Sequence, residues 1–145
     1  PRRYASFVYY NGLDTLEYLS AEAKNYLPPL PIAYDGNLGW YLEMLEMSGG
    51  HGGDNLPKSQ AIKDACMAHN ILINLPSNGV FIHYNGAFHS QNKEGIAWYL
   101  LNENPDLKIM TIDATEQEFI NELEQERMDI ADFIIVTPSS LTKTH

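Results

Sequence analysis

Residues 79–98 read GVFIHYNGAFHSQNKEGIAW, and this stretch decides the fold class. Val80–Tyr84 is a short apolar run bounded by turn-forming residues, which is typical of a strand buried in a parallel sheet. A loop follows over Asn85–Asn92, and a helix is predicted from Lys93 to about Asn102. The passage therefore predicts a strand, a loop and a helix in succession.

The remainder of the second half continues the alternation. Strands are predicted at Lys108–Ile112 and Phe133–Val136, with a charged helix between them over Thr115–Arg127. Phe119, Ile120 and Leu123 would form the buried stripe of that helix. The pattern indicates an α/β fold with a narrow parallel sheet, whose edges need to be covered.

The first half is predicted to be mainly helical. Leu13–Leu27 has apolar residues at helical spacing, and Ser20 can cap a second helix, so one helix and two short helices are both open. Asp35 is a candidate cap for a helix through Trp40 and Leu45. A long helix is predicted from about Lys58 to Leu75, with Pro57 in its first turn.

Composition excludes several classes of function. The chain has 145 residues, enough for one domain, and a formal net charge of -10. Its Lys and Arg residues are scattered and form no basic stripe, so we expect no nucleic-acid partner and no attraction to an anionic membrane surface. The single cysteine, Cys66, leaves the redox compartment open.

Candidate functional residues lie just after the first predicted strand, because ligands in open parallel sheets bind beyond the carboxyl ends of the strands. Gly86 would allow a positive φ and close approach of a ligand, and His89 can donate, accept or ligate a metal. Tyr84 can act as a phenolate ligand to ferric iron. An ordinary turn with a surface histidine is equally compatible with the pattern.

His83, and the pair Asp64 and His69, have simpler structural interpretations. His83, inside the apolar run, is expected to be a core histidine. Asp64 and His69 are expected on different faces of the long helix, where Asp64 suits the helix dipole. The sequence contains no nucleophile elbow, P-loop, dinucleotide fingerprint, His-Glu-x-x-His motif or paired cysteines.

Three stretches together resemble the haem-binding uptake family typified by ChaN, in a superfamily with the Tiki proteases and erythromycin esterases. Pro1-Arg2-Arg3 is similar to a mid-chain Pro-Arg-Arg/Tyr segment of the family. Gln60–Ala68 is similar to its Arg/Lys-Asp-x-x-Met-Ala helix, and Val80–His89 to its apolar strand followed by a glycine-histidine motif. The resemblance covers about Pro1 to Ile112.

The resemblance implies a three-layer α/β fold with a partly parallel sheet, of which this chain would be the C-terminal half. Residues 1–56 would be a helical insertion and residues 57–145 the C-terminal half of the α/β domain. Tyr4–Tyr10 is then expected to be helical. We also expect an exposed apolar face where further strands would pack, or a second copy covering it.

The resemblance further implies a haem-binding protein for iron and haem uptake, more a binding protein than an enzyme. It implies an iron-regulated lipoprotein of the bacterial cell envelope, in the periplasm or at the outer membrane, anchored by lipid outside this chain and acting as a homodimer. The candidate haem-binding residues are Tyr41, Tyr84, Asn85, Gly86 and His89, with His89 and Tyr84 as metal ligands. The alternative is a metal-dependent hydrolase of the Tiki or erythromycin-esterase type, with zinc at His89 and the rest of its site outside this chain.

Overall fold

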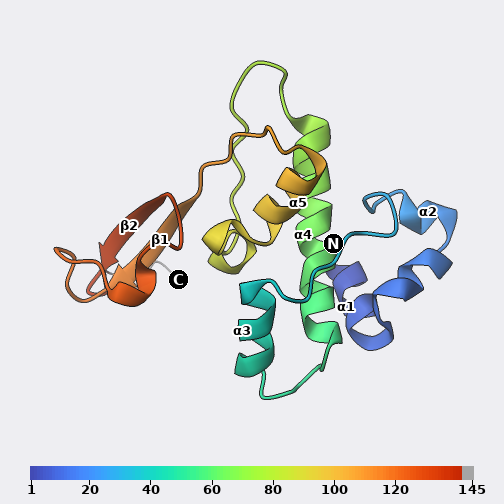
Figure 1. The fold of residues 1–145 in the computed structure, drawn as a ribbon, viewed down its shortest axis with the longest axis horizontal. Helices are drawn as coiled ribbons and strands as arrows, with labels where there is room; N and C mark the ends of the chain where they lie inside the picture. Colours follow the sequence, from blue (N-terminus) through green and yellow to red (C-terminus); the bar gives the residue numbers. More distant parts are fainter. Residues whose placement is uncertain (142–145) are drawn as a thin grey trace.

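The computed structural model describes residues 1–141, in which helices form one part and a small sheet the other (Figure 1). The longer helices are α1 (Arg2–Asn11), α3 (Gly39–Met47), α4 (Asn55–Asn74) and α5 (Ile96–Glu103). The short helices are η1 (Leu13–Tyr18), α2 (Ala21–Lys24), η2 (Ala87–His89), η3 (Gln91–Lys93) and η4 (Gln125–Arg127). The strands are β1 (Ile112–Gln117) and β2 (Phe133–Pro138).

Helix α4 is the centre of the helical part, and α1, α3 and α5 pack around it (Figure 1). The long helix predicted from Lys58 to Leu75 is therefore confirmed, with its start three residues earlier. Ile62 and Cys66 face α1 in one apolar cluster, whereas Ala65 and Ala68 face α5 in another. Because α1, α3 and α5 each cover a different side of α4, buried side chains of α4 contact different helices.

The predicted helix at Tyr4–Tyr10 is confirmed as α1, which packs on α4. The two-helix alternative for Leu13–Leu27 is also confirmed, since η1 and α2 are separate and the Ser20 side chain accepts a hydrogen bond from the Ala23 N–H. The predicted boundary between a helical insertion (residues 1–56) and an α/β half-domain (residues 57–145) falls in the first turn of α4 and stays a prediction.

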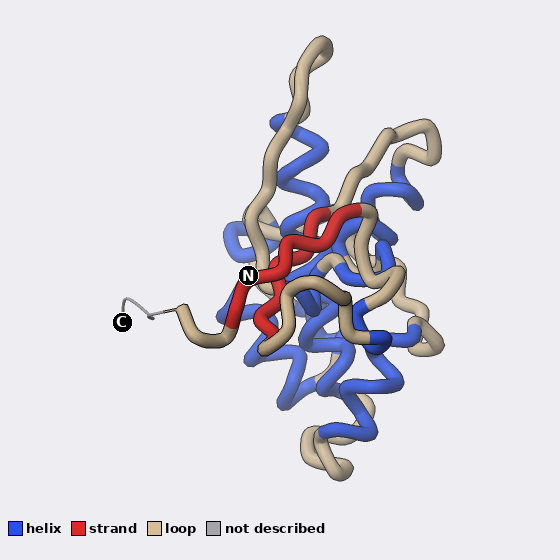
Figure 2. The backbone as a smooth tube through the Cα atoms, turned by 90° about the vertical axis from the view of Figure 1, so that its left-hand side faces the viewer, coloured by secondary structure: helices blue, strands red, loops and turns tan. Residues whose placement is uncertain are grey.

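The sheet is smaller than predicted. β1 and β2 are parallel, with Ile112 opposite Phe133 and Gln117 opposite Pro138, so the parallel pairing and the strand at Phe133–Val136 are confirmed. Figure 2 shows the two strands side by side. A three-layer, three-stranded arrangement does not occur in residues 1–141. The fold of the described chain is mixed helix and strand.

Three predicted elements in the second half are wrong. Val80–Tyr84 forms no strand and is exposed, so it lacks the burial on both faces that its apolar pattern predicted. The strand at Lys108–Ile112 is displaced to β1. The helix at Thr115–Arg127 is replaced by β1, a turn and η4, since the Gln117 side chain donates to the carbonyls of Phe119 and Glu122 and so stabilises a turn.

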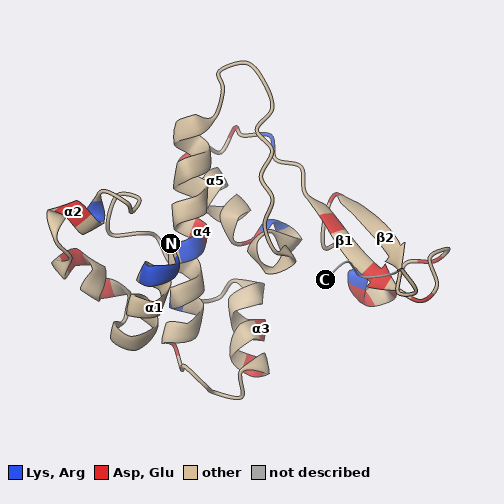
Figure 3. Ribbon diagram, turned by 180° about the vertical axis from the view of Figure 1, so that it is seen from behind, with Lys and Arg blue, Asp and Glu red and all other residues tan. Residues whose placement is uncertain are grey.

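The sheet exposes an apolar face, as expected. Ile112, Phe133 and Ile135 are more than half exposed, whereas Asp113 and Thr115 of β1 are buried. The sheet region joins the helical part through the Asn92 N–H, which donates to the Ile130 carbonyl. Lys and Arg residues are scattered over several elements of the described chain (Figure 3).

Candidate functional site

The loop from Asn85 to Gly95 closes over the middle of α4 and carries η2 and η3. The Asn85 amide donates to the Gly86 carbonyl and to the Ser90 hydroxyl, which stabilises the first turn. The predicted helix at Lys93 begins only at Ile96, because Asn92, Lys93 and Gly95 all have positive φ. The loop thus reverses direction just before α5.

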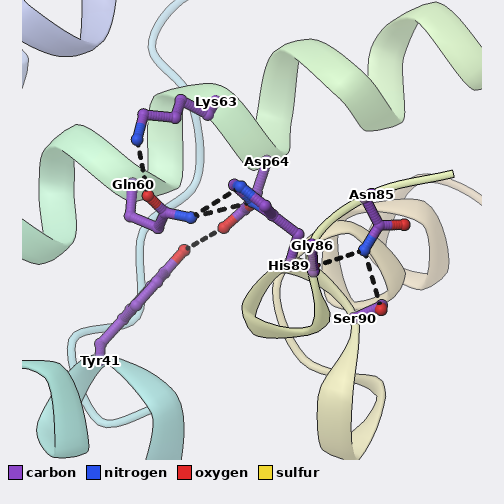
Figure 4. Close-up of polar contacts among 8 residues, drawn as sticks. All are labelled: Tyr41, Gln60, Lys63, Asp64, Asn85, Gly86, His89 and Ser90. Atoms are coloured by element: carbon purple, nitrogen blue, oxygen red, sulfur yellow. Dashed lines mark hydrogen bonds and ion pairs between the residues drawn. The ribbon is translucent and has the colours of Figure 1, made fainter. Parts of the chain in front are cut away.

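A buried carboxylate on α4 meets the histidine of this loop. Asp64 is fully buried, and its Oδ1 lies 2.5 Å from His89 Nδ1 (Figure 4). The side chain of His89 is 20% exposed, so the ring is mostly buried where it contacts Asp64. Burial raises the pKa of the Asp64 carboxyl, and the hydrogen bond from His89 opposes that shift most strongly.

Tyr41 of α3 is the second partner of Asp64. Its hydroxyl donates to Asp64 Oδ2 at 3.3 Å, and the side chain is almost completely buried. Burial, and then the nearby Asp64 charge, raises the pKa of the Tyr41 phenol. The phenol therefore stays protonated at neutral pH and acts as a hydrogen-bond donor.

Gln60 and Lys63 complete the polar cluster on the same helix (Figure 4). Gln60 lies one turn before Asp64, and its Nε2 is 2.9 Å from His89 Nδ1 and 3.1 Å from His89 Nε2. Lys63 Nζ donates to Gln60 Oε1 at 2.9 Å, which turns the amide nitrogen toward the histidine. Tyr41 and Gln60 thus contact the imidazole–carboxylate pair directly, and Lys63 contacts it through Gln60.

An aromatic pair and a helix cap hold the loop against α3. The rings of Phe88 and Trp40 are stacked, with centroids 4.2 Å apart. The Glu94 carboxylate accepts from the N–H groups of Gly39 and Trp40, at 3.0 and 2.7 Å. The predicted cap Asp35 instead accepts from Asn37, before the helix starts, so Glu94 and not Asp35 caps α3.

Glu94→Gln should lower the free energy of unfolding by about 1 kcal/mol, because it removes the negative charge from the positive end of the α3 dipole. Urea unfolding followed by circular dichroism measures the change. Glu43→Gln, on the exposed side of the same helix, is the matched control and should change stability by less than about 0.5 kcal/mol. Equal effects of the two substitutions would show that the cap contributes nothing specific.

The structure separates the predicted site residues into two groups. His89 and Tyr41 meet at Asp64, whereas Tyr84 is 90% exposed. Gly86 has a φ of -70°, so its expected positive φ is wrong, and the positive φ is found at Gly95. His83 is exposed, so the expectation of a core histidine is also wrong.

Sequence reasoning missed Asp64 as a site residue. Asp64 is spaced three residues after Ala61 and four before Ala68, so it falls within the buried stripe of α4. A carboxylate on an apolar stripe is itself a signal, because buried carboxylates require partners. Glu94 offers no comparable signal, since its partners lie 54 and 55 residues away in the chain.

Within residues 1–141, no group of three or more His, Cys, Asp or Glu side chains is arranged to hold a metal ion. No helix among these residues has the length and apolar character needed to cross a membrane. A zinc site at His89 would therefore require ligands beyond those that the described residues bring together.

Residues 1–100 match the family described as haem-binding uptake, Tiki superfamily, ChaN. The matched region includes α1, α3, α4, the loop with His89 and the start of α5, and so the whole Asp64–His89 cluster. Neither a curated protein nor a solved structure matches the chain. Since the family match covers more than half of the sequence, the chain belongs to the haem-binding uptake (ChaN) family of the Tiki superfamily.

Proposed function

We propose that this protein binds haem and that the Tyr84 phenolate is the ligand to its ferric iron. The observation that carries the assignment is the exposure of Tyr84 at the end of an apolar segment that is itself exposed. Val80 and Ile82 are 84% and 69% exposed, and they precede Tyr84 in extended chain. A haem needs an oxygen or nitrogen donor for iron and apolar surface for its macrocycle, and this segment supplies both.

Tyr84 suits this role better than Tyr41. A phenolate ligand has to lose its proton and reach the iron, but the Tyr41 hydroxyl is buried and donates to Asp64. Burial raises the pKa of Tyr41, which disfavours the phenolate form further. Tyr41 is therefore proposed to support Asp64, with Tyr84 as the iron ligand.

The loop that follows Tyr84 can contact the rest of the haem. Asn85 and Gly86 follow Tyr84 directly and keep the chain in a turn, and His89 presents a partly exposed ring. Phe88 is 52% exposed while it stacks on Trp40, so it adds apolar surface beside the histidine. When bound, haem supplies a ferric centre that takes the phenolate; the protein's part is to hold the donor and cover the macrocycle.

The biological setting is part of the same proposal. We propose that haem binding serves iron and haem uptake at the bacterial cell envelope. We further propose that the protein acts as a homodimer and is attached to the membrane by a lipid outside this chain. The exposed apolar residues of the 80–84 segment and of β2 are compatible with an assembly in which they are covered.

A haemin titration of the protein, followed by absorbance, tests the proposal. The unaltered protein should give a saturable spectrum of tyrosine-ligated high-spin iron, and Tyr84→Phe should weaken binding at least about tenfold, because the donor oxygen is lost. Tyr18→Phe is the matched control, since Tyr18 is 88% exposed but lies on η1. Saturable binding that survives Tyr84→Phe would place the iron elsewhere, and no spectral change at all would end the haem hypothesis.

A second candidate is the metal-dependent hydrolase, and the Asp64–His89 pair is the observation that favours it. A buried carboxylate on one ring nitrogen orients a histidine for general-base catalysis or for metal binding through the other. Zinc binding by equilibrium dialysis and hydrolysis of a simple ester, each lost in His89→Ala, would support this candidate. Haem binding without either activity would leave it without support.

A further inference from the structure

We infer that Asp64 is a positioning residue that fixes His89 as the Nδ1–H tautomer, so that Nε2 is the basic atom that His89 offers to the ligand. The inference deepens the proposed haem site and rests on that function for the identity of the ligand. Asp64 itself is fully buried and touches no solvent, so it acts through the imidazole.

The hydrogen-bond pattern around Asp64 supports its role as an acceptor. The Tyr41 phenol, which burial keeps protonated, donates to Asp64 Oδ2 at 3.3 Å. Oδ1 then receives the second donor, His89 Nδ1–H, at 2.5 Å. Two donors directed at the two oxygens are what a carboxylate requires when it has no water.

Gln60 contacts the same imidazole through its side-chain amide. Lys63 can only donate, so Gln60 Oε1 faces Lys63 and Gln60 Nε2 faces the ring. Gln60 Nε2 lies at similar distances from both ring nitrogens, 2.9 Å from Nδ1 and 3.1 Å from Nε2, so the contact that specifies the tautomer is the shorter one with Asp64.

This arrangement has a chemical consequence for a ligand. A carboxylate that accepts from one nitrogen of a histidine increases the basicity of the other and holds the ring orientation, as it does for metal-bound histidines. His89 would then meet the ligand through Nε2 as an electron-pair donor, and a ligand group that takes this position replaces the Gln60 amide.

Nitrogen-15 NMR of the ligand-free protein at pH 8 tests the tautomer directly, above the ordinary titration range of imidazole. The resonances of His89 are identified among those of the five histidines by their loss in His89→Ala. We expect a protonated Nδ1 and an unprotonated Nε2. Asp64→Asn, which keeps the side-chain shape, should convert His89 to a mixture of tautomers; an unprotonated Nδ1 in the unaltered protein would overturn the inference.

The haemin titration supplies the second readout. Asp64→Asn should weaken haemin binding about tenfold or more and shift its spectrum in the direction of His89→Ala. Asp113→Asn is the matched control, because Asp113 is a buried carboxylate of β1 outside this cluster. A spectrum and affinity that change in His89→Ala but not in folded Asp64→Asn would refute positioning by Asp64.

The two proposals can fail separately. If the unaltered protein binds no haemin, the proposed function fails, while the NMR experiment still decides whether Asp64 fixes the tautomer. If Asp64→Asn does not fold, Tyr41→Phe is the second variant: it removes one donor from Asp64, leaves the His89 contact in place and should retain the Nδ1–H tautomer. Loss of that tautomer in folded Tyr41→Phe would contradict the assignment of Asp64 as the residue that fixes it.

Discussion

Gly95→Ala should lower the free energy of unfolding by roughly 3 kcal/mol, the sum of a strained backbone and a steric clash. Gly95 has φ +56° and ψ -117°, a combination that residues with a side chain rarely adopt. A Cβ at this position would lie 2.6 Å from the His89 carbonyl oxygen and 3.3 Å from Asp64 Oδ2. Urea unfolding at pH 7 measures the loss, and the same variant should displace His89 from Asp64.

Gly86→Ala, in the same loop, is the matched control. Gly86 has an ordinary φ of -70°, and nothing lies within 4 Å of a Cβ built there. Its replacement should change stability by less than about 0.5 kcal/mol. If the two substitutions destabilise the protein equally, the turn at Gly95 is not the strained point of the loop.

His89→Ala should destabilise the protein strongly and more at pH 8 than at pH 5. It removes the hydrogen bond that most strongly opposes the raised pKa of Asp64, and a buried charge that loses its partner costs roughly 3–5 kcal/mol. A carboxyl whose pKa is raised in the folded state contributes stability at low pH, which is lost as the pH rises through the folded value. At pH 5 a larger share of Asp64 can take up a proton, so the loss should be smaller there.

Urea unfolding of the unaltered protein and of His89→Ala at both pH values measures this difference. His51→Ala, in the exposed glycine-rich loop, is the control for the loss of a histidine and should change stability by less than about 0.5 kcal/mol at either pH. A loss of the same size at pH 5 and pH 8 would mean that ionised Asp64 is not what His89 stabilises.

Local sequence patterns predicted the helical half of the molecule well. The long helix α4 has Pro57 in its first turn and apolar residues at helical spacing, and Ser20 caps α2 as expected. The same reasoning predicted a strand at Val80–Tyr84 from its apolar, partly β-branched residues, and this was wrong in the described chain. A strand depends on a hydrogen-bonding neighbour, which a local pattern cannot supply.

The candidate site was predicted only in part. His89 was identified from its place after an apolar run, and Tyr41 was a candidate tyrosine by its location, but the carboxylate that joins them was interpreted as a helix-dipole residue. Asp64 lies on α4 and His89 on a loop 25 residues later. Their contact depends on how the loop folds back over the helix at Gly95, which has a positive φ. From the sequence, a positive φ was expected at Gly86 instead.

The sequence by itself determined the family, the helix at the centre of the fold, the strand that begins at Phe133 and the acidic composition with scattered basic residues. The helix and the strand follow from short-range patterns, the charge follows from composition, and the family follows from motifs that resemble it along the chain. Only the tertiary structure decided that Asp64 meets His89 and Tyr41, that Glu94 caps α3 and that Tyr84 is exposed. Each of these depends on contacts between segments far apart in the chain, where burial and the need to pair a desolvated charge outweigh local preference.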